Sequence, residues 1–128
     1  MPRRRKLLGD APKRRWREYR TAAGKSPVEE FLERLADDDA AEIYAGMAEV
    51  RKHGLSAAKH LGDEIWEIKA QGRHESFRVL FAPEGEHGQV LLALVGFSKK
   101  TRKTPPDLIR LAKRRLRDWR SRGRASGR

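Results

Sequence analysis

The sequence of 128 residues contains no cysteine. This absence excludes disulfides, thiol nucleophiles and zinc sites built on cysteine, and it fits a reducing location. No apolar run approaches the roughly 20 residues that a transmembrane helix needs. The first ten residues carry cations but no long apolar region and no cleavage site of small residues, unlike a signal peptide. We therefore expect a cytoplasmic protein that does not contact a membrane.

The sequence also lacks the patterns of the common cofactor and metal enzymes. Its glycines do not form a phosphate-binding loop or a dinucleotide-binding motif. The four histidines have no metal-ligand spacing among themselves or with acidic residues; they are His53, His60, His74 and His87. We expect no metal ion and no cofactor.

Positive charge is abundant and unevenly distributed. The chain has 30 Lys and Arg against 18 Asp and Glu, a net charge of +12. Residues 1–25 carry ten cations against two acids, and residues 99–128 carry thirteen against two. Residues 26–50 reverse this pattern, with eight acids and one cation. Such separation predicts a basic face for a polyanion, with RNA or DNA as the first candidate, and an acidic face elsewhere.

The densest basic segment follows the longest apolar run. Residues 90–97 read as a central strand that is buried on both sides. Four cations come directly after this strand: Lys99, Lys100, Arg102 and Lys103. Thr104 then reads as the N-cap of a helix whose first position is Pro105. The pattern places a basic loop between a rigid strand and a capped helix.

Two short helices are predicted in the first half of the chain. Ser26 and Pro27 form a strong helix start, and apolar residues recur at helical spacing through Leu35. Residues 37–39 are all Asp, which favours the start of a second helix. This helix is expected to end at Gly54, and residues 56–61 are expected to add one helical turn.

The rest of the chain predicts a sheet and a last helix. Alternating residues indicate strands near Trp16 and Tyr19, at 65–69 and at 77–81, with hairpin loops at 71–75 and 83–88. The resulting fold class is α+β, a small antiparallel sheet with two N-terminal helices and a C-terminal helix. We expect a flexible basic N-terminus (1–13), one domain (14–120) and a disordered basic tail (121–128).

Strand alternation brings candidate site residues together. Lys69 and Arg78 fall on the sheet face opposite the aromatic core residues, and they become neighbours if their strands form a hairpin. Lys99 and Lys100 can reach the same end of the sheet, with Arg73 and His74 at its border. The other cations are candidates for contacts with RNA phosphates: Arg102, Lys103, Arg110, Lys113, Arg114 and Arg117.

The chain resembles the RelE/HigB superfamily of bacterial toxins, in its phage-derived branch. The resemblance rests on residues 24–31, 65–69, 77–81, 96–101 and 104–105, and it extends from Trp16 to Trp119. It implies a compact fold of the microbial ribonuclease type and cleavage of messenger RNA, usually on the ribosome. It also implies an antitoxin partner, commonly a helix-turn-helix protein. The basic strand residue of the family corresponds to Lys69, its strand arginine to Arg78, and its cation after the strand to Lys99 or Lys100.

The sequence departs from the better-studied RelE branch at two positions. Glu67 stands where that branch has a further cation, and no tyrosine follows Tyr44. Glu67 and His74 are then the candidates near the site that can accept a proton at neutral pH. The expected activity is a metal-independent endoribonuclease, or mRNA interferase, that inhibits translation. The alternative is an RNA- or DNA-binding module without catalysis, whose cations only contact phosphates.

Overall fold

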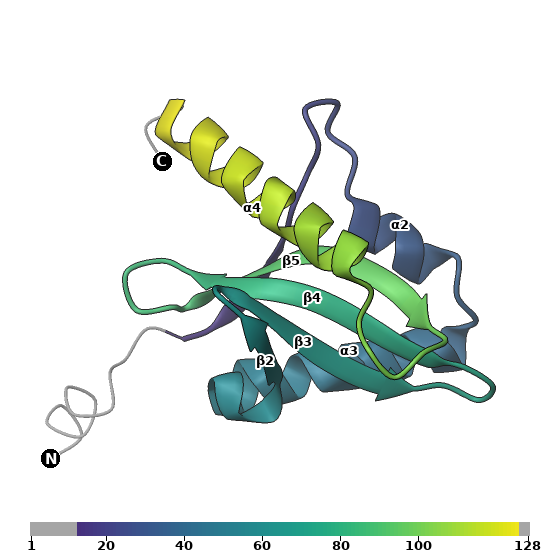
Figure 1. Cartoon of the computed structure of the whole chain (residues 1–128). Coiled ribbons are helices and arrows are strands. Elements are labelled where there is room, and N and C mark those ends of the chain that lie inside the picture. Colours follow the sequence, from purple (N-terminus) through teal and green to yellow (C-terminus); the bar gives the residue numbers. More distant parts are fainter. Residues whose placement is uncertain (1–12, 126–128) are drawn as a thin grey trace, which may run out of the picture.

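A computed structural model of the chain describes residues 13–125. Its strands are β1 (Arg15–Glu18), β2 (Lys59–Gly62), β3 (Ile65–Gln71), β4 (Ser76–Glu84) and β5 (Val90–Lys99). Its helices are α2 (Pro27–Glu33), α3 (Asp37–His53), a short 3-10 turn η1 (Gly54–Ala57) and α4 (Pro106–Ala125). Figure 1 shows three layers, with α2 and α3 on one face of the sheet and α4 on the other.

The sheet has five strands in the order β1-β5-β4-β3-β2. The pairs β5–β4, β4–β3 and β3–β2 are antiparallel, whereas β1 runs parallel to β5. The predicted α+β class is confirmed, but the sheet is mixed rather than wholly antiparallel. The reason is that β1 is the first strand of the chain and joins the sheet beside the last one, so no hairpin connects these two strands.

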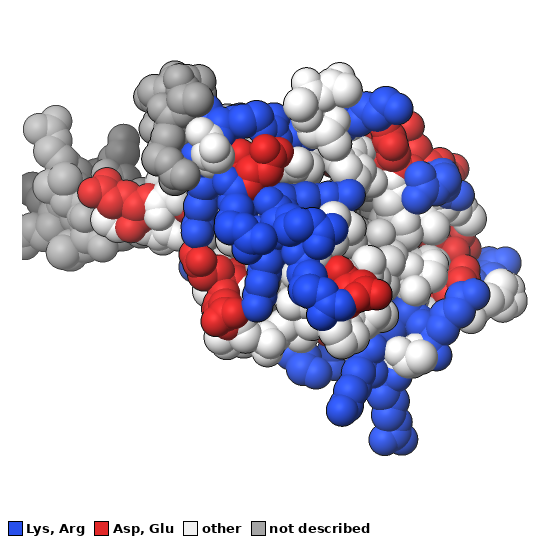
Figure 2. All heavy atoms as spheres, turned by 45° about the horizontal axis from the view of Figure 1, so that its top comes forward, with Lys and Arg blue, Asp and Glu red and all other residues white. Residues whose placement is uncertain are grey.

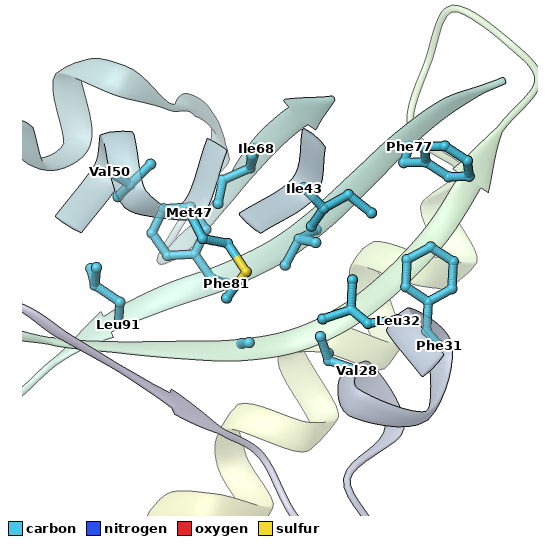
Figure 3. Packing of buried hydrophobic residues seen from close by; sticks show 12 residues of the cluster. Val28, Phe31, Leu32, Ile43, Met47, Val50, Ile68, Phe77, Phe81 and Leu91 are labelled. Atoms are coloured by element: carbon cyan, nitrogen blue, oxygen red, sulfur yellow. The ribbon is translucent and has the colours of Figure 1, made fainter. Parts of the chain in front are cut away.

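The face under α2 and α3 is an apolar core. Ser26 caps α2, because its hydroxyl accepts a hydrogen bond from the Glu29 amide at 3.3 Å. Figure 3 shows apolar side chains of the two helices packing against residues of β3, β4 and β5. Gly96 lets α2 approach β5 closely, since a Cβ at this position would lie 2.4 Å from the Phe31 ring.

Helix α4 covers the opposite face and is held there by polar contacts as well as by its apolar seam. Leu116 and Ala112 are buried against residues of β4 and β5. The Tyr19 hydroxyl donates to Asp118 at 2.6 Å, and Arg120 binds the carboxylates of Glu64 and Glu84. These contacts fix the helix across the sheet, above the first part of β5.

Several predicted boundaries are wrong or shifted. Residues 56–61 do not form one helical turn, because η1 ends at Ala57 and β2 begins at Lys59. Helix α4 begins at Pro106, one residue later than predicted, and it continues through Ala125 into the segment expected to be a disordered tail. The expected flexible N-terminus lies outside the described residues apart from Lys13, as do residues 126–128 of the tail.

Candidate functional site

Pairing between the strands places the two central candidates side by side. Lys69 of β3 is directly opposite Arg78 of β4, as strand alternation predicts. Glu67 lies two residues before Lys69 on the same face, and Lys59 of β2 is opposite Glu67. Arg78 is in turn opposite Phe97 of β5, so Lys99, two residues further on, shares their face. We call these five residues from four adjacent strands the strand-end cluster.

Glu67 is the buried centre of this cluster. Its side chain has no exposed surface, and its Oε1 lies 3.7 Å from Nε of Arg78, whose side chain is 13% exposed. Neither of these two atoms has a hydrogen bond to a described residue, so their attraction is electrostatic. The hydroxyl of Thr104 donates a hydrogen bond to Oε2. A buried carboxylate requires such partners, and this one therefore ties the basic loop to the sheet.

Thr104 consequently has a different role from the one predicted. The sequence pattern makes it the N-cap of the last helix, but its hydroxyl is directed to Glu67. The amides of Leu108 and Ile109 instead bond to the carbonyl of Pro105. The helix start and the sheet are thus linked by one side-chain hydrogen bond across 37 residues of chain.

The surroundings of Lys99 perturb its ammonium group. Its partial burial lowers the pKa of Lys99, because desolvation disfavours the charged form. Glu67 opposes this shift, while Arg78, Lys59 and Lys69 lower the pKa further by charge repulsion. Lys99 therefore reaches the neutral form at lower pH than an ordinary lysine.

The loop after β5 adds exposed positive charge to the end of the cluster. Lys100, Arg102 and Lys103 are all exposed, and the Thr101 hydroxyl bonds to the Lys103 carbonyl at 2.9 Å. Because Lys99 pairs with Ser76, the hairpin that contains Arg73 and His74 lies at the same end of the sheet.

Arg73 and His74 differ in their surroundings. Arg73 is 3.4 Å from a carboxylate oxygen of Asp38, and its amide donates to Asp39 at 3.0 Å, so it joins the hairpin to α3. His74 is exposed and has no hydrogen bond or ion pair with any residue in the described part of the chain. Neither side chain contacts the strand-end cluster in a hydrogen bond or ion pair among residues 13–125.

The four cations of α4 that were predicted to contact RNA fall into two groups. Arg110 pairs with Asp107 within the helix, and Lys113 binds Asp63 at 2.7 Å. Arg114 and Arg117 are exposed and form no ion pair with the residues that the structure describes. Figure 2 shows blue Lys and Arg gathered over the face that carries α4, with red acidic residues set among them. The predicted basic face is therefore present, although part of it is neutralised internally.

Two members of the site were not found by sequence reasoning. Lys59 was not identified from the sequence because residues 56–61 were expected to be helical. In the structure β2 places Lys59 opposite Glu67. The bond between Thr104 and Glu67 had no sequence signal, since the cap pattern explained Thr104 without it. Among residues 13–125 there is no group of three or more potential metal ligands. No helix in this same range is long and apolar enough to cross a membrane.

Comparison with known proteins gives one family. No curated protein matches the chain. The family model described as "Phage derived protein Gp49-like (DUF891)" matches residues 30–117, which is more than half of the chain. The matched range contains all of the strand-end cluster and Thr104. The chain therefore belongs to the phage-derived Gp49-like family, which is associated with toxin–antitoxin systems and related to RelE-type toxins.

Proposed function

We propose that the chain is the toxin of a type II toxin–antitoxin system and acts as a metal-independent endoribonuclease on messenger RNA. The observation that carries this proposal is the convergence of Lys69, Arg78 and Lys99 from three adjacent strands on one sheet face. Such a cluster suits a phosphate, and RNA supplies its own nucleophile in the 2′-hydroxyl. Geometry, charge stabilisation and proton transfer are then all that the protein must contribute.

Arg78 is proposed to bind the phosphate that is cleaved. Attack of the 2′-oxygen on phosphorus places negative charge on the non-bridging oxygens, and a planar guanidinium can contact two of them. Glu67 holds Arg78 from the buried side at 3.7 Å. The exposed Lys69, directly opposite Arg78, adds a second positive charge to the same phosphate.

Lys99 is proposed to accept the proton of the 2′-hydroxyl. Because its pKa is lowered, a larger fraction of Lys99 is in the neutral amine form at a given pH than for an ordinary lysine. The bond from phosphorus to the 2′-oxygen forms as the bond to the 5′-oxygen breaks. The products are a 2′,3′-cyclic phosphate and a 5′-hydroxyl, whose proton comes from a second ammonium such as Lys69 or from water.

The other two candidates for this role are less well placed. The Glu67 side chain has no exposed surface and is already bound to Arg78 and Thr104, which suits it to position Arg78. His74 lies in the exposed hairpin and has no polar contact with the cluster among the described residues. Lys99 is partly exposed and its pKa is lowered, so it is the better candidate to accept the proton.

The partners follow from the same proposal. We propose a helix-turn-helix antitoxin, as in the HigB-like branch, and messenger RNA bound to the ribosome. Expression in a bacterial host tests the first point: the toxin alone should arrest growth, and co-expression of the adjacent gene should relieve the arrest. Mapping of cleaved transcripts in the arrested cells tests the second. Normal growth at good expression, with intact transcripts, contradicts the proposal.

A second candidate function is nucleic-acid binding without cleavage. It is favoured by the exposed, unpaired Arg114 and Arg117 within the described chain and by the internal ion pair of Arg78. Both functions predict salt-sensitive binding, so affinity does not separate them. Detection of the 2′,3′-cyclic phosphate end separates them, because only the nuclease produces it.

A further inference from the structure

A basic groove, separate from the strand-end cluster, lies at the β1 edge of the sheet, between β1 and the C-terminal half of α4. It has a volume of about 380 Å³, and its walls include Arg15, Arg17, Val90, Trp119 and Arg120. A neighbouring hollow of about 390 Å³ shares Arg17 and Trp119 with it. Arg15 is opposite Val90, the first residue of β5, whereas Lys99 is the last. At 3.3 Å per residue the groove is about 30 Å along the strand from Lys99.

Two arginines give this groove its charge. Arg15 and Arg17 alternate on β1 with Trp16, whose indole nitrogen donates to the Met47 carbonyl at 2.8 Å on the α3 side. Both arginines therefore project toward α4. They are exposed, and neither guanidinium has an ion pair or hydrogen bond to any part of the chain that the structure describes.

The other arginines that line the groove and its neighbouring hollow are bound to acidic residues of the protein. Arg120 binds Glu64 and Glu84, and Arg122 binds Asp118 at 2.8 Å. These ion pairs hold α4 in place, whereas Arg15 and Arg17 line the groove without an ion pair to any residue in the range 13–125. Val90 and Trp119 supply the apolar part of the lining.

This combination selects one class of ligand. Guanidinium groups two residues apart on a strand are spaced by about 7 Å, so each can contact a separate phosphate of one chain. A tryptophan beside them offers a surface on which an unpaired base can stack, and this requires a single strand rather than a duplex. We propose that the groove between β1 and α4 binds single-stranded RNA. The RNA contacts this groove at a position well separated from the strand-end cluster.

The inference rests on the proposed function only for the choice of RNA, since binding in the groove does not require cleavage. The test therefore uses a 2′-O-methyl RNA of about 12 nucleotides, which lacks the nucleophile but spans a typical single-strand site. Its affinity for the full chain is measured by fluorescence anisotropy over a range of salt concentrations. The variant is Arg15→Ala/Arg17→Ala. The matched control is Arg51→Ala/Lys52→Ala, which removes two exposed cations from α3 on the opposite face.

Each lost phosphate contact lowers the slope of log affinity against log salt by about 0.7 for a single strand. The groove variant should therefore lose about 1.4 from this slope and bind more weakly at low salt, with an unchanged melting temperature. The control should change much less. Bound RNA should also quench tryptophan fluorescence, and Trp119→Phe should remove that quenching.

Equal slopes for the groove variant and the control would overturn the inference. The inference would also be overturned if the groove variant lost binding to an oligoglutamate peptide but kept its binding to RNA. The groove would then be a protein-docking surface. Failure of the proposed function is seen separately, as absence of cleavage of unmodified RNA by the wild-type chain. That result leaves the anisotropy measurement as an independent test of the groove.

Discussion

Glu67 and Arg78 form an ion pair inside the protein, with 3.7 Å between Oε1 and Nε and no exposed surface on the Glu67 side chain. A glutamate at this position in an alternating strand is expected to face solvent. Because it is buried, the carboxylate interacts with the protein's own residues. It forms the ion pair with Arg78 and accepts a hydrogen bond from the hydroxyl of Thr104. Glu67, an acidic residue within a basic site, thus helps to position Arg78.

The bond between Thr104 and Glu67 should contribute to stability. Thr104→Val keeps the shape of the side chain but leaves a buried carboxylate oxygen without its donor. We expect the free energy of unfolding to fall by about 1–3 kcal/mol, measured by urea denaturation. Thr101→Val is the matched control, because the Thr101 hydroxyl bonds to a carbonyl within the exposed loop. Equal effects of the two substitutions would show that Glu67 does not need Thr104.

Lys99 should give cleavage a characteristic dependence on pH. If the neutral amine accepts the proton, the rate rises with pH toward a midpoint below the ordinary lysine value of 10.5, because the pKa of Lys99 is lowered. Lys99→Arg keeps the positive charge but removes the titration, and cleavage should fall about 10²–10⁴-fold. Lys100→Arg, at the exposed neighbouring residue, should leave the profile in place. An unchanged pH–rate profile in Lys99→Arg contradicts this role.

The close approach of α2 to β5 predicts a steric effect at Gly96. A Cβ at this position lies 2.4 Å from the Phe31 ring, so Gly96→Ala forces the buried ring to move. The expected loss is about 1–3 kcal/mol of unfolding free energy. Phe31→Leu in the same chain should recover part of this loss, although Phe31→Leu alone is destabilising. Simple additivity of the two substitutions would indicate that their side chains do not meet.

Acid should weaken the attachment of α4 at Asp118. Hydrogen bonds from Tyr19 and Arg122 hold the pKa of Asp118 below its ordinary value of 3.8. The stabilisation is therefore complete above this value and is lost as the pH falls through the lower pKa of the folded state. Tyr19→Phe should make thermal stability less dependent on pH in this window. Tyr44→Phe, at an exposed tyrosine, should reproduce the wild-type curve.

Local patterns in the sequence predicted much of the fold. Ser26 and Pro27 mark the start of α2 because capping depends on neighbouring residues only. The pairing of Lys69 with Arg78 followed from strand alternation together with a short hairpin loop. Both are short-range features, and the structure confirms them.

Features that depend on distant parts of the chain were not predictable in the same way. The pairing of β1 with β5 joins strands separated by about 70 residues, so no local signal shows that it is parallel. The burial of Glu67 depends on Thr104 folding over it from the loop after β5. Strand β2 is short and exposed, and it lacks the apolar alternation that marks β3 and β4.

The most direct test of the account is single-turnover cleavage of messenger RNA by the Arg78→Lys variant, with and without translating ribosomes. Lysine keeps the charge beside Glu67 but lacks the planar fork, so we expect a folded protein whose cleavage rate is about 10²–10³-fold below wild type. Arg110→Lys, at an exposed position on α4, is the matched control and should cleave normally. A folded Arg78→Lys protein that cleaves at the wild-type rate would contradict the central claim.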